Sequence, residues 1–527
     1  MQVYPLPNTG RTALLAMLVI VVGLATQRSP LVGFGGAIIL GVALARAGSF
    51  WSIARLRVAG LEMAWRTPQR VTFSVRGGKV ELQSELRNRD VAAVRFHHLR
   101  ALASPDLRIT IAPTEGSIPA AGRLVVTATI ETNRVGQHGI HGLALEVIGA
   151  SGMFEAPLTF ASPKGIEVIP AALARYIFRP YGGRARRFAQ SSRSGYLAGD
   201  GAEFRELREH LPGDAFHRIA WKASARQSKL LVRTFDRDER DVVWIVIQPS
   251  AELFAGVVGR AAIDVILDEA ATLSARHLSR GDHLGTVRVS TPSNEWIHPS
   301  GGVSHARSVS RWLATCARSY DAVSSALSES DVAGSVLEHV RFLDAQHAAG
   351  MRRSDTEKLA ILARELMPRA PFSAQHVAGK GPHDEILRQY TANFGFGSHP
   401  VATDNAVEDA RRLMQSLKEL AAMKPSASAV YVAAKAPPSA VIDEVRILLA
   451  SLRRHGISVR WMLPDVPAAL REFAAAIAAQ GESQTSAARM AIETTVQLEH
   501  AADEAKLKQL GVRMLYPRSS RGSHTGT

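Results

Sequence analysis

The sequence predicts a multidomain protein with an N-terminal transmembrane helical hairpin, a β-sandwich domain and a doubly wound α/β domain. Three observations predict this order. Two uncharged apolar runs open the chain, alternating apolar residues follow from about residue 66, and apolar runs alternate with helical patterns from about residue 241. The chain has 527 residues, of which 46% are hydrophobic, so it is long enough to form several cores.

The first element is a pair of apolar helices within residues 1–50. The runs 12–27 and 29–45 contain no charged residue, and Arg28 separates them. Each run is slightly shorter than the roughly 20 residues that span a bilayer, but flanking residues can extend a helix. The glycines of GFGGAIILG allow close helix packing. The alternative is a cleaved signal peptide ending at the ALA of residues 43–45, but a second apolar run is not part of a signal peptide.

Arginines predict the orientation of this hairpin. Arg46, Arg55 and Arg57 follow the second run, whereas the loop between the runs carries only Arg28. The positive-inside rule therefore predicts a multi-pass protein of the cell inner membrane, with both termini and the large soluble region in the cytoplasm. The net charge of +15 favours an anionic partner, or simply solubility. The single cysteine, Cys316, excludes an intramolecular disulfide and is predicted to be a packing residue.

A β-sandwich is predicted over residues 66–172. Apolar residues alternate at Val71, Phe73 and Val75, and similar strand patterns recur with Gly and Asn between them. Four histidines in this region were weighed as metal ligands: His97, His98, His138 and His141. Adjacent residues, and residues three apart, point to opposite faces of a strand. These histidines are therefore predicted to be polar residues at strand edges that do not share an ion.

The α/β domain is predicted over residues 241–517, followed by a disordered tail at 518–527. It begins with DVVWIVIQPS, an unbroken apolar run typical of a buried parallel strand. Helical patterns then alternate with strands such as SAVYVAAKA and ISVRWMLP, and a long helix is predicted over about 486–509. Strands alternating with helices indicate a doubly wound sheet.

No familiar catalytic motif accompanies these domains. The sequence lacks a G-x-S-x-G nucleophile elbow, an H-E-x-x-H zinc motif and a phosphate loop ending in G-K-S/T. One enzymatic alternative remains, an uncharacterised hydrolase or transferase that uses Glu203, Asp214 and Lys222. Nucleic-acid binding through the Arg-rich residues 182–188 is not expected, because few aromatic residues accompany the arginines.

The signature segment, residues 185–240, contains EFRELREHLPGDAFHRIAWKASARQSKLLVRTF, an ordered string of charged residues, turn residues and a Trp-Lys pair. It resembles the signature of family 58 of the domains of unknown function, DUF58. The matching residues are Glu203, Phe204, Leu207, Arg208, Pro212, Gly213, Asp214, Ile219, Trp221, Lys222, Ser224, Ala225, Arg226, Leu230, Val232, Arg233 and Phe235. The resemblance implies a membrane protein with a von Willebrand factor A-like domain that works with a MoxR-type AAA+ ATPase and other proteins of the same membrane operon.

The chain departs from the family pattern at the expected ion site. In members with such a site, the first strand of the A-like domain ends in Asp-x-Ser-x-Ser, whose oxygens bind Mg²⁺. Here Gln248 replaces the Asp, Glu252 replaces the second Ser, and only Ser250 remains, while a later strand offers Lys435. Loop ligands from Thr403 and Asp404 are the remaining possibility. We expect a degenerate site without a cofactor, in which Gln248, Ser250 and Glu252 bind a partner.

Two interpretations of the signature segment stay open and are compatible. In the first, ion pairs of Glu203, Glu206, Arg205, Arg208 and Arg226 brace the junction between the domains, with Trp221 packed beneath them. In the second, the segment presents a basic face to a partner, because residues 175–240 hold fifteen Arg and Lys against eight Asp and Glu. Together these observations predict a non-enzymatic, membrane-anchored adaptor or scaffold in protein-complex assembly or maturation.

Overall fold

The computed structural model places the chain in two compact units, which are described separately. Unit 1 comprises Met1–Ile169 and Ala317–Pro400, and unit 2 comprises Pro170–Cys316 and Val401–Thr527. The structure describes residues 3–178, 193–211, 216, 219–239, 241–290, 294–317, 328–345, 347–373, 377, 379, 381–396, 406–479 and 486–516. The predicted tail at 518–527 lies outside these residues.

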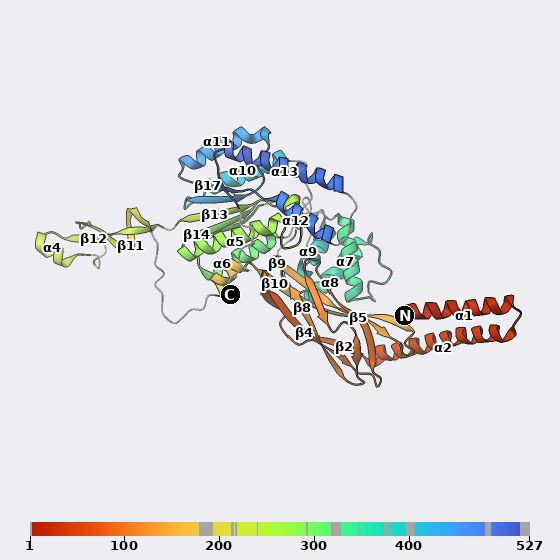
Figure 1. The fold of residues 1–527 in the computed structure, drawn as a ribbon. Coiled ribbons are helices and arrows are strands. Elements are labelled where there is room, and N and C mark those ends of the chain that lie inside the picture. The colour runs from red at the N-terminus through yellow and green to blue at the C-terminus, as the bar shows by residue number, and fades with distance from the viewer. Residues whose placement is uncertain are drawn as a thin grey trace, which may run out of the picture. The chain divides into compact units, whose positions relative to one another are not determined.

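Unit 1 begins with two antiparallel apolar helices, α1 (Pro7–Ala25) and α2 (Ser29–Ala59) (Figure 1). Both are long and apolar enough to cross a membrane. Their large side chains are mostly exposed, as lipid-facing side chains are; Leu14, Leu24 and Leu44 are examples. A proline lies in the first turn of each helix, where its missing N–H costs no hydrogen bond. The N-terminal prediction of two helices able to span a membrane is confirmed to this extent.

The two helices pack closely at Gly35. A Cβ added there would overlap the Ile20 side chain and the Ala16 carbonyl oxygen of α1, whereas one added at Gly36 would meet nothing within 4 Å. Gly35→Val is therefore expected to destabilise the hairpin by about 1–3 kcal/mol, because the helices must separate to accept the side chain. Thermal unfolding of the full chain in detergent measures this. Gly36→Val is the matched control, and an equal loss in both variants would contradict the packing.

The C-terminal end of α2 packs into the core of the next domain instead of extending the part of the helix that could cross a membrane. Ser49, Ile53 and Leu56 are buried, and Ile53 and Leu56 belong to the same apolar cluster as Leu86 and Phe96. The Ser49 Oγ also lies 2.7 Å from the Ser151 Oγ. The helical hairpin is thus anchored directly to the sheets.

Two sheets pack face to face in unit 1. One has the order β1-β10-β9-β5-β7, with β3 paired to β10, and the other has the order β2-β4-β8-β6. Their shared core draws from both sheets, for example Leu86 and Val126 from one and Phe96, Leu143 and Val147 from the other. The strands are β1 (Tyr4–Pro5), β2 (Leu61–Trp65), β3 (Val71–Val75), β4 (Lys79–Asn88), β5 (Val94–Ala103), β6 (Arg108–Ala112), β7 (Gly116–Ile118), β8 (Arg123–Glu131), β9 (Gly136–Ile148) and β10 (Phe154–Ile169).

Three helices from much later in the sequence pack on these strands. They are α7 (Glu329–Leu343), α8 (Thr356–Leu366) and α9 (Pro382–Phe394), with a short 3-10 turn, η3 (Met367–Arg369), after α8. The Ser104 hydroxyl donates to the Gly395 carbonyl at 2.8 Å and so ties the end of α9 to the strands. A Cβ on Gly139 would overlap the Phe394 carbonyl oxygen, so only glycine permits this approach. These helices fall within the segment 241–517 that is predicted to form the α/β domain, whereas the structure places them in unit 1.

Unit 2 is built on a six-stranded sheet with the order β15-β14-β13-β16-β17-β18, in which only β15 is antiparallel to its neighbour. The strands are β13 (Val242–Ile247), β14 (His283–Arg288), β15 (Glu295–Ser300), β16 (Ala429–Ala433), β17 (Ser458–Met462) and β18 (Arg513–Leu515). Every residue of β13 is buried, as expected of a central parallel strand. The predicted buried strand is therefore confirmed over Val242–Ile247 of the run DVVWIVIQPS.

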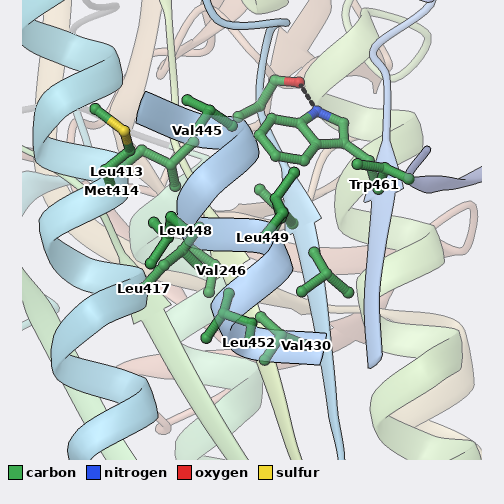
Figure 2. Close-up of a cluster of buried hydrophobic side chains, with 14 of the residues drawn as sticks. Val246, Leu413, Met414, Leu417, Val430, Val445, Leu448, Leu449, Leu452 and Trp461 are labelled. Atoms are coloured by element: carbon green, nitrogen blue, oxygen red, sulfur yellow. Dashed lines mark hydrogen bonds between the residues drawn. The ribbon is translucent and has the colours of Figure 1, made fainter. Parts of the chain in front are cut away.

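Helices cover both faces of this sheet (Figure 1). Val246 and Val430 pack with Leu413 of α10 and Leu449 of α11 on one face, as Figure 2 shows. Tyr431 points to the other face, where its hydroxyl lies 3.1 Å from His277 Nε2 of α5. The helices are α3 (Ala171–Ile177), α5 (Ala262–Arg280), α6 (Gly302–Cys316), α10 (Ala406–Ala422), α11 (Ile442–Arg454), α12 (Val466–Ala479) and α13 (Ser486–Gln509), with the 3-10 turns η2 (Ala251–Phe254) and η4 (Ser439–Val441).

The signature segment contributes a separate antiparallel pair, β11 (Arg193–Glu209) and β12 (Leu231–Glu239), joined through the short helix α4 (Trp221–Gln227). Cys316 lies buried at the end of α6, and burial raises the pKa of its thiol. A buried, protonated thiol is a poor nucleophile, which agrees with the predicted packing role.

Candidate functional site

The order in which strands are added to the sheet of unit 2 reverses between β13 and β16. From β13 the chain passes to its neighbour β14 on one side, and it later returns to β16 on the other side. In open α/β sheets, binding sites lie beyond the carboxyl ends of the strands at such a switch point. Gln248 follows β13 directly, and its backbone N–H donates to the Ala433 carbonyl of β16 at 3.0 Å. The sequence-predicted residues thus lie where a binding site is expected.

Four side chains at this place form what we call the switch-point surface: Gln248, Ser250, Glu252 and Lys435. Lys435 follows β16 and forms an ion pair with Glu252, which lies in η2 just after β13. Their side chains are 42% and 48% exposed, so the pair faces solvent. The Gln248 Nε2 donates to the Asp409 carbonyl oxygen of α10 at 2.9 Å. The structure therefore brings together all four residues that sequence reasoning selected here.

These side chains do not form the oxygen ligand set that Mg²⁺ prefers. The Glu252 carboxylate is paired with an ammonium group, and the Gln248 amide is engaged with a backbone carbonyl. Only the Ser250 Oγ is a buried oxygen without a hydrogen-bond partner. The ammonium of Lys435 supplies a positive charge from within the chain. Thr403 and Asp404, the possible loop ligands, lie outside the described residues.

The signature segment is held locally by a buried serine. The Ser224 hydroxyl accepts the Leu231 N–H at 2.9 Å and lies 3.1 Å from the Ala220 carbonyl, which fixes α4 against β12. An exposed ion pair between Lys229 and Glu209 spans 2.7 Å nearby. Ser224 is therefore a structural residue of the signature.

Other signature side chains are exposed rather than packed. Trp221 is 61% exposed, so the expectation that it packs beneath a network of ion pairs is wrong. Exposed apolar side chains accompany it at Leu207, Leu211, Phe216 and Leu230, together with exposed basic side chains at Lys222, Arg226 and Arg233. Among the described side chains, the signature segment thus exposes apolar and basic residues together.

Several predicted residues fall outside the described part. These are Pro212, Gly213 and Asp214, the side chains of Glu203 and Phe204, and the Arg-rich residues 182–188. Lys222 of the enzymatic alternative is exposed on α4. The enzymatic alternative needs Glu203, Asp214 and Lys222 together, and it stays a prediction because only the Lys222 side chain lies among the described residues.

The structure corrects the prediction for two pairs of histidines in unit 1. His138 and His141 are buried, not polar residues at a strand edge, and His141 lies in an aromatic cluster with His339 and Phe396. His97 and His98 share one face because a β-bulge interrupts β5, and their rings stack with centroids 4.2 Å apart. Side chains stop alternating between the two faces of a strand at a bulge, and no residue pattern in the sequence predicts this bulge.

A scan against protein families matches the model described as a protein of unknown function, DUF58, to residues 206–345. The match supports the DUF58 family for this part of the chain and assigns no activity. No curated protein matches the chain.

Several solved structures resemble small parts of the chain. The PapD-like domain 7 of human CEP192 shares 17% identity, with a TM-score of 0.17, and the match covers 21% of this chain and 87% of that domain. WR4, a Caenorhabditis elegans member of the MSP family, shares 7% identity, with a TM-score of 0.14, over 21% of this chain and 97% of that protein. At these TM-scores the likenesses carry no argument about fold or function.

Proposed function

We propose that this DUF58-like chain is a non-enzymatic, membrane-anchored adaptor whose switch-point surface binds a partner protein. The observation that carries the proposal is the Lys435–Glu252 ion pair at the carboxyl ends of β13 and β16. It places an internal cation and an exposed carboxylate at the position where this type of sheet binds its ligands. The surface needs no bound metal ion to present that charge pattern.

The order of the sheet supports a von Willebrand factor A-like domain. Counted in chain order, the strands run 3-2-1-4-5-6 across the sheet, and the third is antiparallel. The resemblance of the signature segment implies that the partner is a MoxR-type AAA+ ATPase, with other membrane-operon proteins as clients or co-adaptors. In this proposal the two apolar helices tether the chain to the inner membrane. The arginines in the second half of α2, Arg46, Arg55 and Arg57, favour a cytoplasmic location for the soluble units.

The exposed side chains of the signature segment supply a second contact area. Residues 207–233 carry six Arg and Lys against two Asp and Glu, a difference of +4, and five large apolar side chains there are exposed. Exposed apolar side chains surrounded by positive charge are complementary to an acidic surface on a partner protein. This area adds affinity and speeds encounter, while the switch-point surface sets specificity.

Co-purification tests the proposal. The full chain, with a C-terminal tag, is purified in detergent from its native membrane with ATP and crosslinker, and bound proteins are identified by mass spectrometry. We expect a stoichiometric AAA+ ATPase, lost when Gln248 and Glu252 are both changed to Ala. Asp443→Ala, which removes another exposed, ion-paired carboxylate of unit 2, is the control. Absence of any stoichiometric partner would overturn the adaptor function.

A further inference from the structure

A β-bulge in β5 brings four metal-binding side chains onto one face of the sheet. His97 pairs with Glu146 of β9, but the next paired residue on β5 is Arg100, which pairs with Ala144, so β5 holds one extra residue. That residue is His98, with φ of +52°. Phe96 and Leu99, which flank the two histidines, are buried in the core, whereas the side chains of His97 and His98 are 17% and 72% exposed.

The ligand atoms of this cluster are already close together. Glu146 Oε2 lies 2.6 Å from His98 Nδ1 and 3.5 Å from His97 Nε2. Glu155 of β10 adds a second carboxylate, with its Oε2 2.6 Å from His97 Nε2. The ligand atoms of His97, His98 and Glu146 all lie within 4.8 Å of one another.

We propose that His97, His98, Glu146 and Glu155 bind a divalent transition-metal ion of the Zn²⁺ class. Two imidazoles with carboxylates suit Zn²⁺, whereas Mg²⁺ and Ca²⁺ prefer oxygen ligands alone. In a tetrahedral zinc site, ligand atoms lie about 3.3 Å apart, given metal–ligand bonds of about 2.0–2.1 Å. The 3.5 Å separation already fits. The shorter His98–Glu146 contact can open by a small side-chain rotation, which the 72% exposed His98 side chain permits. The His97–Glu155 contact must widen by less than 1 Å to reach the same separation.

The backbone at His98 supports a built site. A non-glycine residue in the left-handed region is strained, and such strain gathers at functional positions. Here the strain turns His98 toward the same carboxylate that His97 faces.

The location suggests what the ion does. Glu155 pairs with Tyr4 in the β1–β10 ladder, and the next residues of the chain enter α1. The Leu6 N–H also donates to the Met153 carbonyl at 3.0 Å. An ion held by β5, β9 and β10 therefore reinforces the sheet where the apolar hairpin joins it.

Metal binding by the full chain tests the proposal. The chain is purified in detergent with a tag free of histidine, stripped of metal, and titrated with Zn²⁺ alone; bound metal is measured by elemental analysis and Tm by scanning fluorimetry. We expect one Zn²⁺ per chain, a rise in Tm of several degrees, and a visible tetrahedral spectrum when Co²⁺ replaces Zn²⁺.

Variants distinguish Zn²⁺ binding at this site from Zn²⁺ binding by other histidines. His98→Gly removes a ligand and relieves the left-handed strain, so the chain stays folded. Glu146→Gln removes the shared carboxylate. Each is expected to weaken Zn²⁺ binding by at least about 100-fold, more than loss of a supporting outer contact costs. His347→Ala, which removes another exposed histidine paired with a carboxylate, is the control. Absence of stoichiometric Zn²⁺, or binding unchanged in both variants, would overturn the site and leave a hydrogen-bonded cluster.

Discussion

Lowering the pH from 7 to 4.5 is expected to destabilise unit 1 by about 5 kcal/mol through two buried histidines alone. Burial lowers the pKa of His141 to about 4 and that of His339 to about 2. The unfolded chain protonates both near the ordinary value of 6.5, while the folded chain keeps both neutral, so the unfolded state binds more protons below pH 6.5. Stability is present above that pH and falls as pH decreases, by roughly 3 kcal/mol per pH unit below about pH 5.5.

The surroundings of these rings disfavour a second proton on either imidazole. Both nitrogens of His141 and the Nε2 of His339 are buried without a hydrogen-bond partner. The His339 Nδ1 lies 2.8 Å from the Tyr390 hydroxyl, and Phe394 and Phe396 pack around both rings. Among the described residues, no ion pair joins either ring to a carboxylate, and a charge on His141 would lower the pKa of His339 further.

Chemical denaturation at a series of pH values measures this effect, and hydrogen exchange in residues 329–396 localises it. His141→Phe removes one titrating group and can still stack on Phe396. It is expected to lower the contribution of these histidines to the pH dependence by about half. A variant with the same pH dependence as the parent would show that His141 does not stay neutral in the folded chain.

Asp384→Ala is expected to destabilise the same helical group by about 3–5 kcal/mol. Asp384 and Arg388 lie one turn apart on α9, both 1% exposed, and both carboxylate oxygens accept from the Arg388 Nε at 3.1 and 2.9 Å. Removing the carboxylate leaves a buried guanidinium without this counter-charge, which costs far more than loss of an exposed pair.

Denaturation of the full chain, with proteolysis across 329–396, measures this loss. Asp443→Ala breaks an exposed pair with Arg446 and is expected to cost less than about 1 kcal/mol. The double change Asp384→Leu with Arg388→Met is expected to recover most of the stability, because apolar residues often replace a buried pair without loss. A cost for Asp384→Ala as small as that of Asp443→Ala would refute the role of the pair.

Much of the fold follows from local patterns. The apolar runs predict α1 and α2, and the alternation around Val71 predicts β3. The pattern at 486–509 predicts α13, which the structure gives as Ser486–Gln509. These elements are set by residues close together in the chain. Alternation nonetheless does not say which face is buried, and Phe73 of β3 is 63% exposed.

Long-range packing was not predictable in the same way. Helices α7–α9 join unit 1 through contacts such as that of Ser104 with Gly395, which are 291 residues apart. A helical period shows that a face is apolar but not which surface covers it. The bulge at His98 could not be predicted from the sequence for a similar reason, because it arises from strand pairing and not from composition.

The residues of the switch-point surface were predictable from the sequence, whereas the contact between them was not. Gln248, Ser250, Glu252 and Lys435 were selected from the resemblance, since the strand ends carry the wrong residues for an ion. What the sequence could not give is the ion pair itself, which joins residues 183 positions apart (435 − 252) through parallel pairing of β13 and β16.

One measurement tests the central claim that the switch-point surface binds a partner by its charge pattern. Co-purification of the proposed AAA+ ATPase partner is compared for the parent, Glu252→Lys, Lys435→Glu and the double charge exchange, with Asp443→Lys as control. Because the pair is exposed, each change alters stability by no more than about 1 kcal/mol. We predict loss of the ATPase in both single variants and in the double variant, whose pair is intact but reversed. Undiminished retention in all three, or full rescue by the double exchange, would contradict the claim.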